Sequence, residues 1–160
     1  AASDVYKRQG THNRTSPQQV MRYLNRLSGP FLDRFDLSIE VPLLPQGSLQ
    51  NAEDRGETSQ QVREKVLKVR EIQLARAGKI NAYLSSKEIE RDCKLQDKDA
   101  QFLENALNKL GLSVRAYHRI LKVSRTIADL NGEKEIQQPH LAEALGYRAM
   151  DRLLQKLSAA

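Results

Sequence analysis

The sequence contains one cysteine, no tryptophan and few aromatic residues, which make up 5% of its 160 residues. A single cysteine, Cys93, excludes an internal disulfide and favours a reducing compartment such as the cytoplasm. No apolar run approaches the roughly 20 residues that a membrane-spanning helix requires. Because aromatic side chains are scarce, Leu, Ile, Val and Ala have to build the core, and that composition is typical of packed helices.

The motif of a self-sufficient nucleotide-hydrolysing enzyme is also missing. A phosphate-binding loop reads G-x-x-x-x-G-K-[ST], because backbone amides and a lysine must surround the phosphates. The only Gly-Lys pair is Gly78-Lys79, which is followed by Ile80, and position 73 is glutamine instead of glycine. No apolar strand ends in acidic residues that would hold Mg²⁺. We therefore expect that the chain does not hydrolyse a nucleotide alone.

Residues for metal binding or covalent catalysis are few and scattered. The histidines and the cysteine lack the spacing of metal ligands; they are His12, Cys93, His118 and His140. No G-x-S-x-G turn and no Cys-His arrangement is present. The sequence therefore predicts no metal site and no covalent nucleophile.

Basic residues outnumber acidic ones, 26 to 20, which gives a formal net charge of +6. An excess of this size fits a polyanionic partner such as nucleic acid or nucleotide phosphate. It fits a merely well-solvated surface equally well, so the charge alone does not identify a partner.

The first part of the sequence predicts a helix, a turn and one strand. Residues 1–9 show no periodicity, and we interpret them as a cloning or assembly artefact. Ser16-Pro17 begins a helix over 17–27, since serine caps helices and proline suits the first helical position. Polar and apolar residues alternate over 36–41, which predicts a strand. A strand without partners in the same chain supports the interpretation that the sequence is a piece of a larger protein.

The remainder predicts a helical domain. We divide the chain into residues 10–45, a linker over 46–57 rich in Pro and Gly, and a helical domain over 58–160. The expected helices cover residues 58–77, 86–92, 97–110, 113–130 and 138–157. The apolar stripe of the first consists of Val62, Val66, Val69 and Ile72. The buried side of the third consists of Phe102, Leu103, Ala106, Leu107 and Leu110.

The segment around Arg34 combines a helix stop, a short turn and the start of the strand. Leu32 and Phe35 anchor this turn, so the guanidinium of Arg34 projects outward. The alternative without a functional role is a surface ion pair of Arg34 with Asp33 or Asp36, which contributes little to stability.

Several runs of the sequence together resemble a known family. They are residues 16–19, 22–30, 33–37, 56–59, 76–82, 110–130 and 148–152. They resemble the ComM/YifB family of magnesium chelatase-like AAA+ ATPases, and the likeness extends from Gly10 to Leu157. The implied fold is mainly α: a helical-bundle lid of the magnesium chelatase C-terminal type, preceded by a remnant of the AAA+ α/β core with one strand. Many relatives carry cysteines before the Ser-Pro helix, and their absence here gives no support for a metal knuckle.

The resemblance also implies roles for individual residues. Arg34 matches the arginine finger that reaches a neighbouring subunit's nucleotide, and Arg115 matches the sensor-2 arginine of the lid. Arg119, Lys122 and Arg125 follow on the same helix as candidates for nucleic-acid contact. The alternative for these last residues is the solvated side of an amphipathic helix.

The implied parent is a bacterial, cytoplasmic, ring-forming ATPase that uses ATP and Mg²⁺ and acts on DNA. Relatives of this kind drive branch migration during natural transformation. Two alternatives remain open: the ATPase subunit of a magnesium chelatase, and a helical module that binds DNA without ATP. In each case we expect the chain to lack the segments that bind ATP and Mg²⁺.

Overall fold

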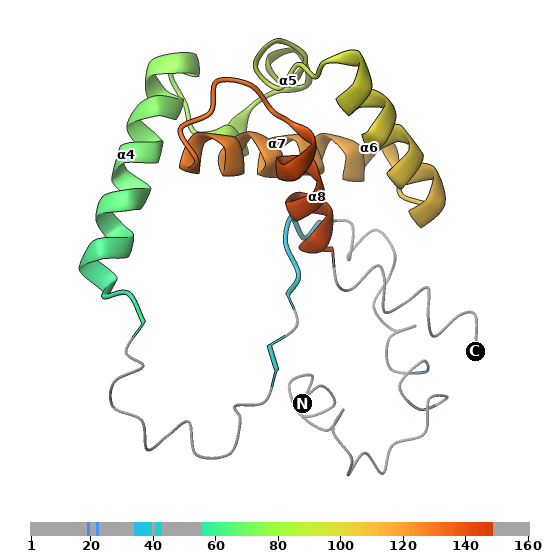
Figure 1. The fold of residues 1–160 in the computed structure, drawn as a ribbon, viewed down its shortest axis with the longest axis horizontal. Coiled ribbons are helices and arrows are strands. Elements are labelled where there is room, and N and C mark those ends of the chain that lie inside the picture. The colour runs from blue at the N-terminus through green and yellow to red at the C-terminus, as the bar shows by residue number, and fades with distance from the viewer. Residues whose placement is uncertain (1–18, 20–21, 23–33, 40, 43–55, 149–160) are drawn as a thin grey trace.

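A computed structural model describes residues 19, 22, 34–39, 41–42 and 56–148. This part of the chain is mainly helical, as the sequence predicts (Figure 1). Its elements are α4 (Ser59–Ala77), the 3-10 turn η1 (Asn81–Tyr83), α5 (Ser86–Asp92), α6 (Asp97–Leu110), α7 (Val114–Leu130) and α8 (Gln138–Gly146).

The ends of these helices are set by capping residues. Thr58 caps α4 and exchanges hydrogen bonds with Gln61, and Ser113 accepts a hydrogen bond from the amide of Ala116 at the start of α7. Gly78 ends α4 with a φ of 68°, a left-handed conformation that favours glycine. The predicted bounds of α4, α5, α6 and α7 are confirmed, because each depends on such local signals.

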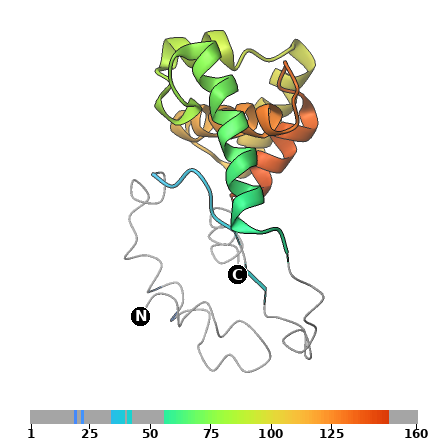
Figure 2. The ribbon, with the colours of Figure 1, turned by 90° about the vertical axis from the view of Figure 1, so that its left-hand side faces the viewer.

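Helix α7 is the centre of the bundle. It contacts α4, η1, α5 and α8, while α6 packs on α8. Figure 1 shows α7 lying across the domain, with α4 beside one end and α6 towards the other, and Figure 2 shows the same domain from the side of α4. Every other described helix is therefore placed relative to α7 or to its partner α8.

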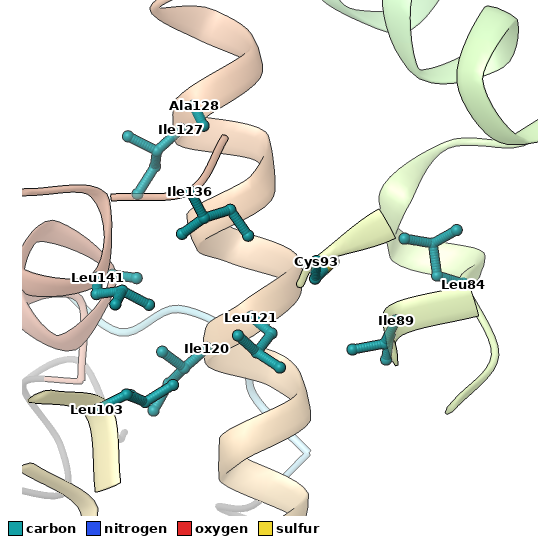
Figure 3. Close-up of a cluster of buried hydrophobic side chains, with 11 residues drawn as sticks. Leu84, Ile89, Cys93, Leu103, Ile120, Leu121, Ile127, Ala128, Ile136 and Leu141 are labelled. Atoms are coloured by element: carbon teal, nitrogen blue, oxygen red, sulfur yellow. The ribbon is translucent and has the colours of Figure 1, made fainter. Parts of the chain in front are cut away.

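One apolar core surrounds α7. Ile120, Leu121, Ile127 and Ala128 extend along this helix in Figure 3. Around them lie buried side chains from the other elements, namely Leu84, Ile89, Cys93, Leu103, Ile136, Leu141 and Ala144. Among the predicted buried residues of α6, Leu103 is fully buried, while Phe102 and Leu107 pack at the edge of the core.

The predicted apolar stripe of α4 is mostly wrong. Val69 is buried, but Val62, Val66 and Ile72 remain exposed, Val62 by 44%. Val62 and Val66 lie in the first half of α4, whereas only the second half lies against α7 (Figure 1), and Ile72 lies in that second half but off the face that buries Val69 and Gln73. The core-facing position one turn after Val69 is the buried Gln73, whose side chain accepts a hydrogen bond from the amide of Asn81.

The last helix ends earlier than expected. Helix α8 stops at Gly146, so a continuous helix over 138–157 is wrong. Glycine disfavours helix continuation, and the next residues leave the helical path to meet the segment that contains Ser38. The amide of Ser38 donates to the carbonyl of Tyr147 at 2.6 Å, and Ser38 forms a single parallel bridge with Arg148.

No strand is present among the residues that the structure describes, so the predicted strand over 36–41 is wrong within this range. Among the described residues, the one β-bridge of this segment is that of Ser38 with Arg148. The alternating pattern is real, but Leu37, Ile39 and Val41 are exposed. The alternating polar and apolar residues therefore did not predict a sheet, because no described segment pairs with them as a strand.

Other expectations fall largely outside the described residues. Gln19 and Arg22 are helical, in agreement with a helix over 17–27, and they are the described residues of that range. The assignments for residues 1–9 and for most of 10–45 and 46–57 lie outside the described part. No described helix is long and apolar enough to cross a membrane, and the described residues contain no cluster of His, Cys, Asp or Glu suited to a metal ion.

Candidate functional site

A buried ionic cluster joins α4 to α7. The carboxylate of Asp129 accepts two hydrogen bonds of 2.7 Å from Arg76, and another of 2.9 Å from the side-chain amide of Asn81. Arg125, one turn earlier on α7, donates from Nε to the same carboxylate at 3.1 Å. The cluster connects the end of α4 to α7 through a carboxylate that is 1% exposed and an Arg76 side chain that is 23% exposed.

Electrostatics within this cluster favour the ionised carboxylate. Burial by itself raises the pKa of Asp129, but the hydrogen bonds from Arg76 and Asn81 and the charge of Arg125 outweigh it, so the pKa is lowered. For Arg76, the hydrogen bond to Asp129 raises the pKa of the guanidinium. Both groups therefore stay charged at neutral pH.

Arg125 is consequently not a surface residue. Its side chain is 3% exposed, and its other nitrogens donate to the carbonyls of Glu133 and Lys134. The expectation that Arg125 contributes to a nucleic-acid-binding face is wrong. Arg125 lies one helical turn after Lys122, but its guanidinium is buried by its bonds to Asp129 and to the carbonyls of Glu133 and Lys134.

Apart from the buried cluster, α7 carries a row of basic residues. Each lies three or four positions from two of the others, which places them on one face of a helix; they are Arg115, His118, Arg119 and Lys122. This row lines a pocket of about 520 Å³. The opposite wall comes from the start of α5 and from the segment before it, with Ala82, Leu84, Ser85, Ser86 and Ile89, and Asp36 lines its edge.

Two of the four residues are held in place by the protein. Arg119 donates from Nη1 to the carbonyl of Arg34 at 2.7 Å and also to the carboxylate of Asp36. Lys122 donates to the carbonyl of Ala82 at 2.9 Å. These contacts connect α7 with the Arg34 turn on one side of the pocket and with η1 on the other.

Arg115 is in a different state. It lies in the first turn of α7 with an exposed side chain, and it has no ion-pair partner within the described part of the chain. A guanidinium offers five donors in a planar fork that matches phosphate oxygens. Arg115 is therefore the residue of this pocket that is most available to an anion.

Arg34 is not among the residues that line the pocket and lies in an exposed turn. Its backbone carbonyl is bound by Arg119. The alternative ion pair between Arg34 and Asp36 is not formed, because Asp36 pairs with Arg119. Asp33 lies outside the described residues.

Three residues of this region were not selected as site residues by the sequence analysis. His118 lies at the helical spacing that selected Arg115 and Arg119, so the pattern could have included it. Asp36 was considered only as a partner of Arg34, and Asp129 has the i,i+4 spacing from Arg125, but their contacts with Arg119 and Arg76 span 83 and 53 positions and could not be predicted from spacing.

The fold and the pocket define a helical domain with a basic site beside an arginine turn, and the comparisons with known proteins identify its class. The family model described as "Magnesium chelatase, subunit ChlI C-terminal" matches residues 56–148, and the model described as "Magnesium chelatase, subunit ChlI" matches residues 2–49. The chain belongs to the magnesium chelatase family, in its ComM/YifB group.

Relatives within this group are similar over most of the chain. The Competence protein ComM of Haemophilus influenzae is 90% identical over 149 residues, which are 93% of this chain and 29% of the relative. The protein YifB of Escherichia coli is 56% identical over 146 residues, or 91% of the chain and 29% of the relative. A Mycobacterium tuberculosis protein is 34% identical over 131 residues, 79% of the chain and 26% of the relative. The chain thus spans less than a third of the length of these relatives.

Proposed function

We propose that this chain supplies the arginine finger and the sensor-2 lid of a ring-forming AAA+ ATPase of the ComM type. The observation that carries the proposal is the pocket on α7, where Arg115, His118, Arg119 and Lys122 converge beside the Arg34 turn. Three of these side chains are arginine or lysine, and the site fits a strongly anionic ligand such as a nucleoside triphosphate.

Within this pocket, Arg115 would act as the sensor-2 residue. Its guanidinium needs no rearrangement of existing ion pairs before it binds phosphate oxygens, in contrast to Arg119 and Lys122. ATP and Mg²⁺ would be held mainly by parts of the parent protein outside this chain, because the chain carries no phosphate-binding loop.

Arg34 would act on a different nucleotide. The exposed turn leaves its side chain at the surface, next to its own lid and outside its own pocket. A fixed cation presented to a neighbouring subunit would stabilise the negative charge that develops on the transferred phosphoryl group. We propose that Arg34 acts in trans, on the nucleotide of the next subunit in the ring.

We propose that this ATPase acts on DNA in the bacterial cytoplasm, where it drives branch migration during DNA uptake and recombination. The 90% identity to a protein named for competence favours this role over porphyrin metallation. Binding of DNA by the α7 face alone is the weaker alternative, since Arg125 is buried and two of the remaining cations are bound to backbone carbonyls. Steeply salt-dependent binding of DNA to the isolated chain would favour it.

A suitable protein for testing these roles is a chimera, in which this chain replaces the matching segment of Haemophilus influenzae ComM. In the chimera, Arg115→Ala is expected to raise the Kd for ATP with Mg²⁺ about 10- to 100-fold, the effect of losing a charge-assisted contact of about 1.5–3 kcal/mol. Titration with a fluorescent ATP analogue measures this.

The matched control is Arg91→Ala. Arg91 is also an exposed helical arginine, but it pairs with Asp92 away from the pocket. Its loss is expected to leave ATP affinity within about twofold, since exposed pairs contribute little. Equal affinities in the Arg115→Ala and Arg91→Ala proteins would refute the sensor-2 role.

For the isolated 160-residue chain, ATP with Mg²⁺ is expected to leave the melting temperature unchanged. A ligand raises the melting temperature only when its concentration exceeds its Kd for the folded state, and the lid pocket alone lacks the phosphate loop. Thermal unfolding with and without millimolar ATP checks this. A clear upward shift below 1 mM ATP would show that the chain contains a complete nucleotide site.

A further inference from the structure

The Arg34 turn is attached to the lid by three sets of contacts. Arg119 of α7 binds both the carbonyl of Arg34 and the carboxylate of Asp36. Ser38 donates its amide to Tyr147 just after α8, at 2.6 Å. Arg148 donates to the carbonyl of Phe35 at 3.4 Å. The turn is therefore held at both of its ends by residues of the helical domain.

Arg119 is the contact that joins the turn to the pocket. It lies four positions after Arg115 on the same helical face, a rise of about 6 Å along α7. Its side chain is only 23% exposed, whereas that of Asp36 is 57% exposed. Because Arg119 is the better-packed partner, a shift or rotation of α7 would carry the backbone of the Arg34 turn with it.

We propose that Arg119 is a positioning residue, which couples α7, and hence the nucleotide bound at Arg115, to the placement of Arg34. This inference rests on the proposed function of Arg34 and Arg115. It adds that the lid of one subunit, in response to its own nucleotide, positions the Arg34 that acts on the nucleotide of the neighbouring subunit.

The charge of Asp36 separates this proposal from a plain phosphate site. Asp36 is an anion at the edge of a pocket that is otherwise basic. If the pocket served only to attract phosphate, removing this negative charge would leave ATP binding and turnover unchanged or improve them. If Asp36 and Arg119 form a tether for the finger turn, removing Asp36 lowers turnover without weakening ATP binding.

The test uses Asp36→Ala, Arg119→Ala and the double variant in the ComM chimera, with Arg91→Ala as control. Both single variants are expected to lower turnover about 10- to 100-fold, the effect of a small misplacement of a catalytic group. The double variant is expected to be no slower than Arg119→Ala, because both changes break one tether. Turnover within about twofold of the unsubstituted chimera for Asp36→Ala, or effects that multiply, would overturn the proposal.

A second measurement reads the tether without relying on ATP hydrolysis. Amide hydrogen exchange of a peptide covering residues 34–39 is expected to become faster in both single variants, while peptides from α7 and α8 keep their rates. Unchanged exchange over 34–39 would overturn the tether, whatever the kinetics show. If Arg34→Ala had normal turnover, the finger assignment itself would fail, whereas the exchange result would still decide whether Arg119 holds the turn.

Discussion

Replacing Arg34 by alanine in the ComM chimera is expected to lower ATP turnover by a factor of about 10³ or more, while ATP still binds. Arginine fingers have effects of this size because they neutralise charge that develops only in the transition state. The exposed turn around Arg34 holds the residue close to the lid but outside the lid pocket. The loss should therefore appear in the catalytic rate and not in ATP affinity.

Steady-state ATPase assays and ATP titrations on the same preparation separate these two quantities. Arg22→Ala is the control, since Arg22 is also an exposed arginine, at a helical position twelve residues before Arg34 in the sequence. Normal hydrolysis by assembled Arg34→Ala rings would rule out the finger assignment. A higher Kd with unchanged turnover would make Arg34 a nucleotide-binding residue instead.

Replacing Asp129 by alanine is expected to destabilise the helical domain by about 3–5 kcal/mol, because it leaves buried guanidinium groups without a counter-charge. The side chains of Asp129 and Arg125 are 1% and 3% exposed, so water cannot take the place of the carboxylate. Since whole domains are stable by only about 5–15 kcal/mol, this loss would bring the domain close to unfolding at ambient temperature.

Chemical denaturation of the 160-residue chain, followed by circular dichroism, measures this change. Glu57→Ala is the control, because the exposed pair of Glu57 with Lys65 is expected to contribute less than about 1 kcal/mol. Equal midpoints for the two variants would show that the cluster between α4 and α7 does not support the fold.

The same cluster predicts how stability depends on pH. The pKa of Asp129 is lowered in the folded chain, so its contribution is complete above the ordinary aspartate pKa. It is lost as the pH falls through the lowered value in the folded state, because the unfolded chain then binds the proton more readily. The Asp129→Asn protein should accordingly lose less stability than the parent chain on acidification.

Local signals in the sequence were enough to predict most of the helices. Thr58, Ser85, Ser113 and the glycines after α4 and α6 fix the ends of their helices through contacts within a few residues. The basic row on α7 was also predictable, because helical spacing alone places Arg115, Arg119 and Lys122 on one side.

Features that depend on distant partners were not predictable in this way. The stripe at Val62 and Val66 has the correct helical spacing, yet these residues are exposed, since α7 passes only the second half of α4. Arg125 and Asp129 resemble an exposed i,i+4 ion pair, but Arg76, 53 residues from Asp129, completes a buried cluster around them. Sequence spacing specifies a face of a helix but does not specify what covers it.

Some features of the candidate site could be predicted from the sequence and others could not. The resemblance to the ComM/YifB family selected Arg34 and Arg115 as candidates, and the structure places Arg34 in an exposed turn and Arg115 in the pocket on α7. It did not indicate that Arg119 and Asp36 join the two regions. That contact arises from packing of the segment around Arg34 against α7 and the end of α8.

In the proposed ring, Arg34 serves the nucleotide of a neighbouring subunit. The most direct measurement mixes the Arg34→Ala chimera with chimera subunits that cannot bind ATP, neither of which should hydrolyse ATP alone. In mixed rings, an intact ATP site of one subunit meets the intact Arg34 of the other, so ATPase activity is predicted to return and to peak near equal proportions. If the mixture remains as inactive as its separate components, Arg34 does not act in trans.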